Sequence, residues 1–392
     1  MEELIARFME RYLPRKEIVH RLPVSVSINR FWPELEKERR RQSQELPLPD
    51  QGGKLFWFVL NGSIEKQCDA IAALARRDIA FSGTLFDALM EDAVLDEAVY
   101  SVAIEGAFTS RKQAADLIRQ NRQPRNKSEQ MVKNNYDALT YVLEHLEDAI
   151  NEEMILAIAK IVTRGASEVQ VMGYREGQVY VMGREGVVYT PPKADAVPQM
   201  MRSLTEFIQE SELHPLLKAC IAHFYFVYVH PFEDGNGRCA RALSYMMLLQ
   251  AGYDFFRYVS VSNIVAEERN KYYRAMRNVE DSDGDMTYFI DAYSDMLART
   301  VIKMEDHLRY HVFAAQKLKA LEEAGALNDR QLKGAKWLLE GGGASVTVEA
   351  WRKKYKVVTE TARRDLLALC DAKVVERKTE GRKAVFHVLR EP

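Results

Sequence analysis

Apolar residues recur at helical spacing through most of the chain, and this pattern predicts a mainly α-helical protein. One segment, residues 215–229, is apolar on almost every face, which predicts a helix through the middle of a bundle. Pro215 suits the first turn of that helix. The segments with helical periodicity are 64–78, 92–105, 110–121, 128–149, 151–163, 197–210, 215–229, 238–250 and 263–278.

A hairpin is predicted around residues 175–190, where the helical period is lost. The stretch "REGQVYVMGREGVVYT" alternates β-branched and aromatic residues about a turn that contains glycine, and "PPK" closes it. We therefore expect two short antiparallel strands inside an otherwise helical region.

The C-terminal end also departs from the helical pattern. A long polar helix from about 296 to 323 is followed by "GALNDRQ", which breaks the pattern and begins a unit of about 65 residues. Its segments predict three short helices, then a strand, a basic turn and a strand, which resembles a winged helix-turn-helix. From Trp351 onward there are 12 Lys and Arg against 6 Asp and Glu, so this unit is basic.

Five residues of this unit are candidates for contact with DNA. Thr361, Arg363 and Arg364 belong to the segment that corresponds to a recognition helix, and Arg382 and Lys383 belong to the basic turn, or wing. Modules of this kind also dock proteins or form homodimers. DNA binding, protein docking and dimer formation therefore remain open alternatives for the C-terminal unit.

The composition is that of an ordinary globular protein. The chain has 392 residues, 47% of them hydrophobic, and a formal net charge of −2, which argues against a wholly basic nucleic-acid binder. Its four cysteines include no C-x-x-C pair, which predicts reduced thiols and no zinc site. The N-terminal "MEELIARFMERYLPRKE" lacks the apolar core of a signal peptide, and no run reaches membrane-spanning length. We expect a cytoplasmic protein without a membrane partner.

The candidate chemistry is concentrated in "HPFEDGNGRCAR", residues 230–241, directly after the apolar segment 215–229. The end of that helix delivers His230, and Gly235 and Gly237 permit backbone angles and close approach that other residues resist. A second helix then begins, so the loop lies at a helix N-terminus. Free N–H groups and the positive end of the helix dipole favour phosphate there.

Charged side chains complete this predicted polyphosphate site. Arg238 and Arg241, three residues apart, project from one face of the first turn. Asp234 can hold a Mg²⁺ ion that bridges phosphate oxygens, and Asn236 can donate to a phosphate without adding charge.

The order H-x-F-x-D-G-N-G-R-x-x-R resembles the signature of the Fic family at every specified position. The resemblance covers about residues 92–300 and implies an α-helical Fic core that transfers AMP from ATP to a hydroxyl of a target protein, the protein itself included. Related Doc-type kinases have a lysine where this chain has Gly237, so the resemblance favours nucleotidyl over phosphoryl transfer. The matching residues are His230, Phe232, Asp234, Gly235, Asn236, Gly237, Arg238 and Arg241.

The resemblance also implies roles for individual residues. His230 would accept the proton of the target hydroxyl as general base, since an ordinary imidazole is largely neutral near pH 7. Arg241 would reach the γ-phosphate, and Tyr272 and Tyr273 would line the nucleoside end of the site. Phe232 is expected to anchor the loop in the core and takes no part in the chemistry. The residues of the flap that would clamp the target segment are Val179, Tyr180, Val181, Met182, Gly183 and Arg184.

A second signal lies upstream in "YSVAIEGAFTSRKQ". Ser101 and Glu105 are four residues apart and so share a helix face, and Gly106 suits a helix C-cap. Ser110 and Gln113 predict a capping box that begins the next helix. These features alone describe a helix end.

The same stretch matches S-x-x-x-E-G, the inhibitory motif of Fic proteins, N-terminal to the catalytic motif. The resemblance implies that Glu105 pairs with Arg241 and denies that arginine to the γ-phosphate. It places this chain among Fic proteins whose inhibitory helix precedes the core in the same polypeptide.

The sequence thus predicts four regions and leaves the function open between classes. The regions are an N-terminal helical region (1–91), the Fic core with its inhibitory helix (92–300), a linker helix (301–324) and the winged unit (325–392). The main hypothesis is an autoinhibited protein adenylyltransferase that uses ATP and Mg²⁺. The alternatives are a DNA-binding regulator with the Fic core as nucleotide sensor, and an enzyme that removes AMP from its targets.

Overall fold

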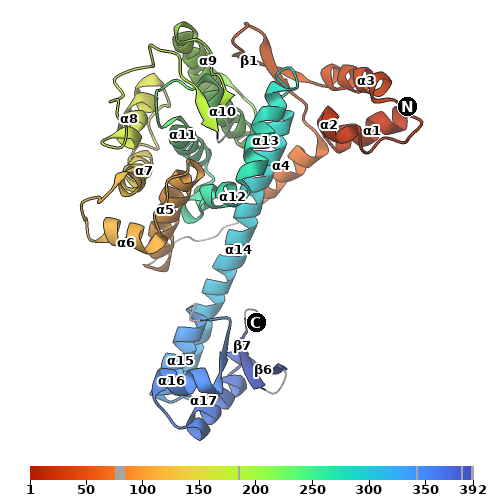
Figure 1. Cartoon of the computed structure of the whole chain (residues 1–392). Coiled ribbons are helices and arrows are strands. Elements are labelled where there is room, and N and C mark those ends of the chain that lie inside the picture. The colour runs from red at the N-terminus through yellow and green to blue at the C-terminus, as the bar shows by residue number, and fades with distance from the viewer. Residues whose placement is uncertain (76–83, 184–185, 341–342, 381–382, 390–392) are drawn as a thin grey trace. The chain divides into compact units, whose positions relative to one another are not determined.

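Most of the described chain is α-helical, as the sequence pattern predicts (Figure 1). The structure is a computed structural model that describes residues 1–75, 84–183, 186–340, 343–380 and 383–389. It divides into two units, Met1–Val301 and Ile302–Pro392. Among the described residues, no helix combines the length and the apolar character that crossing a bilayer requires.

The first unit is built from helices of very different length. Short 3₁₀ turns η1 (Ala194–Ala196) and η2 (Asp254–Tyr258) lie between some of them. In chain order the α-helices are α1 (Glu2–Glu10), α2 (Arg15–Ile18), α3 (Ile28–Arg41), α4 (Gly62–Ala75), α5 (Thr84–Ile104), α6 (Arg111–Arg119), α7 (Lys127–Glu144), α8 (Glu152–Thr163), α9 (Val197–Glu210), α10 (Pro215–Val229), α11 (Asn236–Gln250), α12 (Val261–Glu267), α13 (Arg269–Glu280) and α14 (Thr287–Ala324), which continues into the second unit.

Helices α10 and α11 form the buried centre of the first unit (Figure 1). Nearly every side chain of α10 is buried, as its all-round apolar sequence predicts, and α10 packs along α11. His223 of α10 is fully buried and bonds Ser244 and Tyr272. Helices α5, α7 and α8 cover α11, so the loop between α10 and α11 is supported from several sides.

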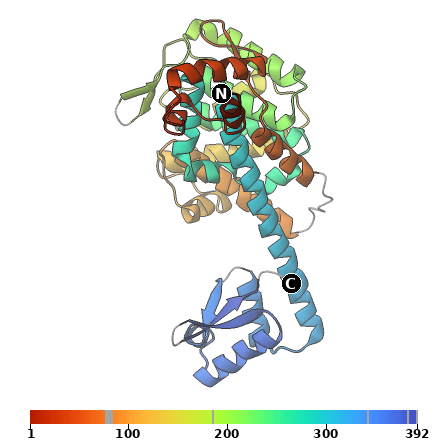
Figure 2. The ribbon, with the colours of Figure 1, turned by 90° about the vertical axis from the view of Figure 1, so that its right-hand side faces the viewer.

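The predicted hairpin is present as β3 (Val181–Gly183) and β4 (Gly186–Tyr189), which pair antiparallel. Figure 2 shows it extending away from the helices of the first unit. Arg184, which the sequence analysis assigned to the flap, lies outside the described residues.

A second hairpin, β1 (Gln44–Pro49) with β2 (Leu55–Phe58), was not predicted from the sequence. The backbone of Trp57 donates to the carbonyl of Gly284 and accepts from the amide of Met286, just before α14. This hairpin is therefore stabilised by a segment more than 200 residues away, which periodicity in a short window does not reveal.

The boundary predicted between residues 91 and 92 falls inside α5. Residues 1–91 also bond directly to the end of the first unit: the Tyr12 hydroxyl donates to Asp285 at 2.6 Å, and Arg39 donates to the Tyr288 hydroxyl at 2.6 Å. The structure therefore places the N-terminal region and the predicted core in one unit.

The three helices and two strands predicted for the second unit are present in the predicted order, but a further short strand, β5, between the first two of these helices was not predicted. Its sheet is antiparallel with strand order β5-β7-β6. The buried core includes Trp351 and Phe386 and also Ala314 and Leu321 of α14, so part of the predicted linker helix belongs to this unit. The elements are α15 (Asp329–Leu339), β5 (Ser345–Thr347), α16 (Val348–Tyr355), α17 (Thr359–Asp371), β6 (Val375–Glu380) and β7 (Lys383–Val388).

Candidate active site

His230 is the C-cap of α10, and its backbone is left-handed with φ 51° and ψ 59°. Its Nδ1 lies 3.1 Å from the carbonyl oxygen of Val227. Because a carbonyl can only accept, Nδ1 carries the proton and Nε2 has a free lone pair. Burial lowers the pKa of the imidazole below its usual value, although the contact with Val227 opposes this shift. The half-buried side chain is therefore a neutral base near pH 7.

The loop after His230 is closed by one buried amide. The Asn236 Oδ1 accepts from the Phe232 N–H at 2.9 Å, and its Nδ2 donates to the Phe232 carbonyl at 2.8 Å. Asn236 is buried, so the structure gives it a loop-closing role that the sequence analysis did not predict. The Phe232 side chain is fully buried against Phe226 and Tyr174, which agrees with its predicted anchoring role.

Gly235 is the N-cap of α11 and has φ 81°. A Cβ at this position would lie 3.0 Å from methyl carbons of both Val162 and Thr163 on α8. Glycine is therefore required here twice, for the backbone angle and for close packing against α8. Since Gly235 has no side chain to cap α11, the first N–H groups of that helix remain available to an anion.

Replacing Gly235 by alanine should cost about 1–3 kcal/mol more of the free energy of unfolding than replacing Gly252. Gly252 is the matched control, because it has φ 82° but no atom within 4 Å of the added Cβ. The backbone angle alone costs about 1–2 kcal/mol at both positions. Urea denaturation of the two variants measures the difference. Equal losses in the free energy of unfolding would contradict the prediction, because they would show that α8 can move away from the added Cβ without destabilising the protein.

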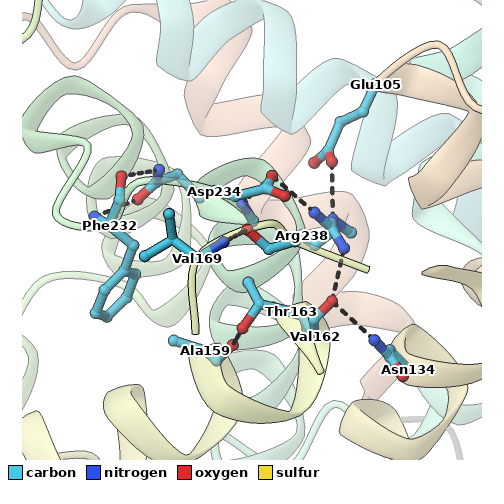
Figure 3. Close-up of polar contacts among 12 residues, drawn as sticks. Glu105, Asn134, Ala159, Val162, Thr163, Val169, Phe232, Asp234 and Arg238 are labelled. Atoms are coloured by element: carbon cyan, nitrogen blue, oxygen red, sulfur yellow. Dashed lines mark hydrogen bonds and ion pairs between the residues drawn. The ribbon is translucent and has the colours of Figure 1, made fainter. Parts of the chain in front are cut away.

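Arg238 is fully buried and makes three hydrogen bonds. Its Nε donates to Glu105 Oε2 at 2.8 Å, one terminal nitrogen donates to Asp234 Oδ1 at 3.0 Å, and the other to the Val162 carbonyl at 2.7 Å. Figure 3 shows the guanidinium between the carboxylates and the end of α8. The Val162 carbonyl also accepts from Asn134 of α7, so several helices fix the position of Arg238.

Arg241 makes the contact with Glu105 that the sequence predicts. Its terminal nitrogen lies 2.8 Å from Glu105 Oε1, and the same nitrogen donates to the Ser101 carbonyl. The Arg241 Nε donates to Ser101 Oγ at 2.7 Å. Ser101 and Glu105 therefore hold the Arg241 guanidinium together, as expected for two residues on one face at the end of α5.

The carboxylate of Glu105 thus bridges two arginines, whereas the sequence analysis predicted only one of them. Burial disfavours its charge, but Arg238 and Arg241 outweigh burial and hold the pKa of the carboxyl below its usual value. A Cβ at Gly237 would lie 2.7 Å from Glu105 Oε1. The absence of a side chain at Gly237 is what allows the carboxylate to approach the first turn of α11.

The helix ends around Glu105 also agree with the prediction. Gly106 follows α5 with φ 89°, and Ser110 and Gln113 form a reciprocal capping box at the start of α6. Earlier on α5, buried Glu97 accepts from the N–H of Ser262 and from the Ser260 hydroxyl at the start of α12. The S-x-x-x-E-G motif therefore lies at the end of a helix that is fixed at several points.

Asp234 accepts from the N–H of Gly235 at 2.6 Å and from Arg238, and its side chain is 36% exposed. Among the described residues, no cluster of three or more His, Cys, Asp or Glu side chains could by itself hold a metal ion. A metal bound here would need most of its ligands from elsewhere, such as phosphate oxygens or water.

The two predicted nucleoside residues have different surroundings. Tyr272 is buried, and its hydroxyl lies 2.7 Å from the Nε2 of His223. Tyr273 is 41% exposed, and the Arg269 guanidinium lies 5.5 Å from its ring centre. Tyr273 is therefore the one of the pair that can offer its ring to a ligand without displacing core contacts.

The flap residues present an apolar surface. Tyr180 and Met182 are exposed, at 56% and 66%, and Val187 and Val188 of the facing strand are exposed as well. Val179 and Val181 are partly buried. Apolar side chains on a short two-stranded hairpin suit contact with another polypeptide.

The predicted DNA-contact residues are placed only in part. Arg363 and Arg364 are exposed on α17, and neither has an ion-pair partner among the described residues. Thr361 is partly buried on the same helix. Arg382 and the side chain of Lys383 lie outside what the structure describes.

A buried arginine that the sequence analysis did not single out, Arg175, lies beside His230. It is 4% exposed, and its Nε donates to the His230 carbonyl at 2.8 Å. The sequence analysis assigns the stretch "GYREG" that contains it only to the start of the predicted hairpin. The signal that could have indicated a functional role is a charged residue between glycines directly before an apolar hairpin.

Together these features define a class: a helical domain that carries a neutral histidine and two arginines around an uncapped helix N-terminus. Residues 149–248 match the model of the Fic/DOC family, so this part of the chain is similar to Fic domains.

Known proteins with similar sequences are named protein adenylyltransferase Fic. That of Drosophila yakuba is 32% identical over 131 residues, which are 33% of this chain and 24% of that protein. That of Aedes aegypti is 25% identical over 247 residues, 61% of this chain and 46% of that protein. The chain thus spans less than half the length of either relative.

Solved Fic structures share the fold. A Fic family protein from Desulfovibrio desulfuricans G20 has a TM-score of 0.57 and 22% identity, with 86% of this chain and 98% of that chain covered. Fic-1 from C. elegans has a TM-score of 0.51 and 20% identity, with 63% of this chain and 73% of that chain covered. Their extent supports a Fic fold that reaches beyond residues 149–248.

Proposed function

We propose that this protein transfers AMP from ATP to a hydroxyl side chain of a target protein, and that Glu105 inhibits the reaction. The observation that carries the proposal is the neutral His230, with a free Nε2, next to the N-terminus of α11 and its two buried arginines. The names of the similar proteins support the same activity.

The reaction is an attack of the target hydroxyl oxygen on the α-phosphorus of ATP. The new P–O bond forms as the bond to the β-phosphate breaks, pyrophosphate leaves, and the hydroxyl proton moves to His230 Nε2. The N–H groups at the start of α11, with Arg238 and Arg241, stabilise the negative charge of the phosphates. Because these groups are already fixed, little reorganisation is needed as the charge moves.

A Mg²⁺ ion fits the proposal. Magnesium in nucleotide sites is commonly held by one or two carboxylates together with phosphate oxygens and water, and Asp234 is a carboxylate of the required exposure. When bound, the ion would neutralise phosphate charge. Gly235 and Arg238 both donate to Oδ1 of Asp234, so the other carboxylate oxygen, Oδ2, would be the ligand of the ion.

Inhibition follows from the contacts of Glu105. Its carboxylate occupies both guanidinium groups that the phosphates require, so ATP competes with an internal anion. The flap surface around Tyr180 and Met182 would hold the target segment, and Tyr273 would contact the nucleoside.

Labelled ATP tests the proposed reaction. Protein carrying Glu105→Gly, with Mg²⁺ and a cell lysate, is incubated with ATP labelled on either the α- or the γ-phosphate. AMP transfer predicts label on protein only from α-labelled ATP, whereas phosphoryl transfer gives label only from γ-labelled ATP. Release of AMP from a modified target by the wild type, and not by Glu105→Gly, would favour the alternative function, hydrolytic removal of AMP from targets.

A second candidate function, DNA binding, belongs to the second unit. The observation that favours it is the pair Arg363 and Arg364 on α17, which are exposed and have no ion-pair partner in the part of the chain that the structure describes. Their replacement by alanine should weaken binding to duplex DNA and reduce the slope of log affinity against log salt by about 2. Arg352→Ala is the matched control, because Arg352 is ion-paired with Glu349. No gel shift even at low salt would leave protein docking or dimer formation as the function of this unit.

A further inference from the structure

Arg175 bonds the backbone at the catalytic histidine and on both sides of it, through its guanidinium and its amide. It donates to the carbonyl of His230 at 2.8 Å and to that of Val229 at 3.3 Å, and the Arg175 amide donates to the Pro231 carbonyl at 2.9 Å. Three successive carbonyls, from the end of α10 into the loop, are therefore oriented by one residue.

The same guanidinium bonds both ends of the flap segment, defined as residues 177–192. It donates to the Gly177 carbonyl at 3.0 Å and to the Pro192 carbonyl. The hairpin β3–β4 lies between these two points. The Arg175 side chain therefore links the two ends of the flap segment to His230, the proposed general base.

The setting of Arg175 is unusual for a purely structural arginine. It is almost completely buried, and among the described residues all acceptors of its guanidinium are backbone carbonyls, with no carboxylate. Burying a cation without a counterion is costly. The negative end of the α10 dipole offsets part of this cost, because Val229 is its last residue.

The backbone of His230 needs such support. A residue other than glycine pays about 1–2 kcal/mol for a left-handed conformation. With φ 51° this conformation directs the imidazole back toward Val227, whose carbonyl fixes the Nδ1–H tautomer. Contacts that hold the neighbouring carbonyls thereby determine which ring nitrogen is the base.

We propose that Arg175 is a positioning residue that couples the flap segment to His230, so that a target segment on the flap presents its hydroxyl to Nε2. This inference rests on the proposed AMP transfer. The planar fork of arginine is required, because a lysine ammonium cannot reach carbonyls on the loop and at both ends of the flap segment together.

The test is Arg175→Lys in the full chain that also carries Glu105→Gly. We expect kcat for AMP transfer to fall about 10- to 100-fold, since a displacement of about 1 Å at a reacting group has effects of that size. The affinity for ATP should stay within about twofold, because Arg238 and Arg241 are untouched. Arg202→Lys is the control, because Arg202 is exposed and its guanidinium donates to Gln199 on its own helix, so kcat should stay unchanged.

A second readout is the His230 imidazole itself, followed by ¹⁵N NMR. The proposal predicts loss of the single Nδ1–H tautomer in Arg175→Lys, whereas a merely structural role would lower the melting temperature and leave the tautomer intact. If no variant transfers AMP while the tautomer changes, the proposed function fails and the positioning role stands. A folded Arg175→Lys protein with unchanged kcat and tautomer overturns the inference. If Arg175→Lys does not fold, Arg175→Gln takes its place. If neither variant folds, Arg175 has a purely structural role, which also overturns the inference.

Discussion

Replacing His230 by alanine should lower the rate of AMP transfer by about 10²- to 10⁴-fold, the usual contribution of a general base. The reason is geometric: Nδ1 is held by the Val227 carbonyl, so Nε2 is the nitrogen able to take the hydroxyl proton. Single-turnover rates in the Glu105→Gly background measure the loss. The affinity for ATP and the melting temperature should change little, since among the described residues no hydrogen bond joins the His230 side chain to Arg238 or Arg241.

His145→Ala is the matched control for this substitution. His145 is also a helix C-cap, on α7, and its Nδ1 lies 2.7 Å from the Tyr141 carbonyl, so the same kind of cap is removed at a distance from the site. Its rate should stay at the parent value. Undiminished transfer by His230→Ala would exclude His230 as the base.

The same assignment predicts the pH dependence of the rate. Burial lowers the pKa of His230, and a base must be deprotonated to act. The rate should therefore be constant from pH 8 to about 6.5, the ordinary histidine value, and fall only as the pH drops through the lowered pKa. A rate that already declines between pH 8 and 7 would contradict this.

Glu105→Gly should raise the initial rate of AMP incorporation by about 10- to 100-fold at limiting ATP. The carboxylate makes charge-assisted hydrogen bonds to two arginines, and release of one such bond, worth about 1.5–3 kcal/mol, accounts for an increase of this size. Arg241→Ala should not activate, because it removes the inhibitory pair and the phosphate contact together. The double variant should behave like Arg241→Ala alone.

Two further measurements test this inhibitory contact. Glu91→Gly, an exposed position on the same helix α5, should not raise the rate. Glu105→Gly leaves two buried guanidinium groups without their shared anion, so its melting temperature without ATP should fall and the stabilisation by ATP should increase. If Glu105→Gly is no faster than the wild type at any ATP concentration, Glu105 is only the end of a helix.

The sequence by itself determined the features that depend on neighbouring residues. Helical period and capping signals predicted most helices, the capping box at Ser110, and the hairpin β3–β4, because these forms are stabilised within a few residues. The site loop was predictable because its histidine, glycines and arginines all lie within residues 230–241. A short loop and the start of the following helix are enough to bring them together.

Contacts between distant residues were predictable only where a family resemblance supplied them. Glu105 and Arg241 are 136 positions apart, and their pairing followed from the motif S-x-x-x-E-G rather than from any local preference. The second bond of Glu105, to Arg238, lies outside that motif and appears only when α5 packs beside α11.

The tertiary structure decided the rest, because packing sets which backbone groups are left without partners. Arg175 has its role from carbonyls 54 and 55 positions away at the end of α10, and nothing in its local sequence indicates them. The hairpin β1–β2 depends on the segment before α14, and Asn236 closes its own loop because its side chain is buried. Helices can be predicted from intrinsic helix propensities, which differ by about a few tenths of a kcal/mol per residue and depend on nearby residues only. Whether a charge or an amide is buried depends on the whole fold.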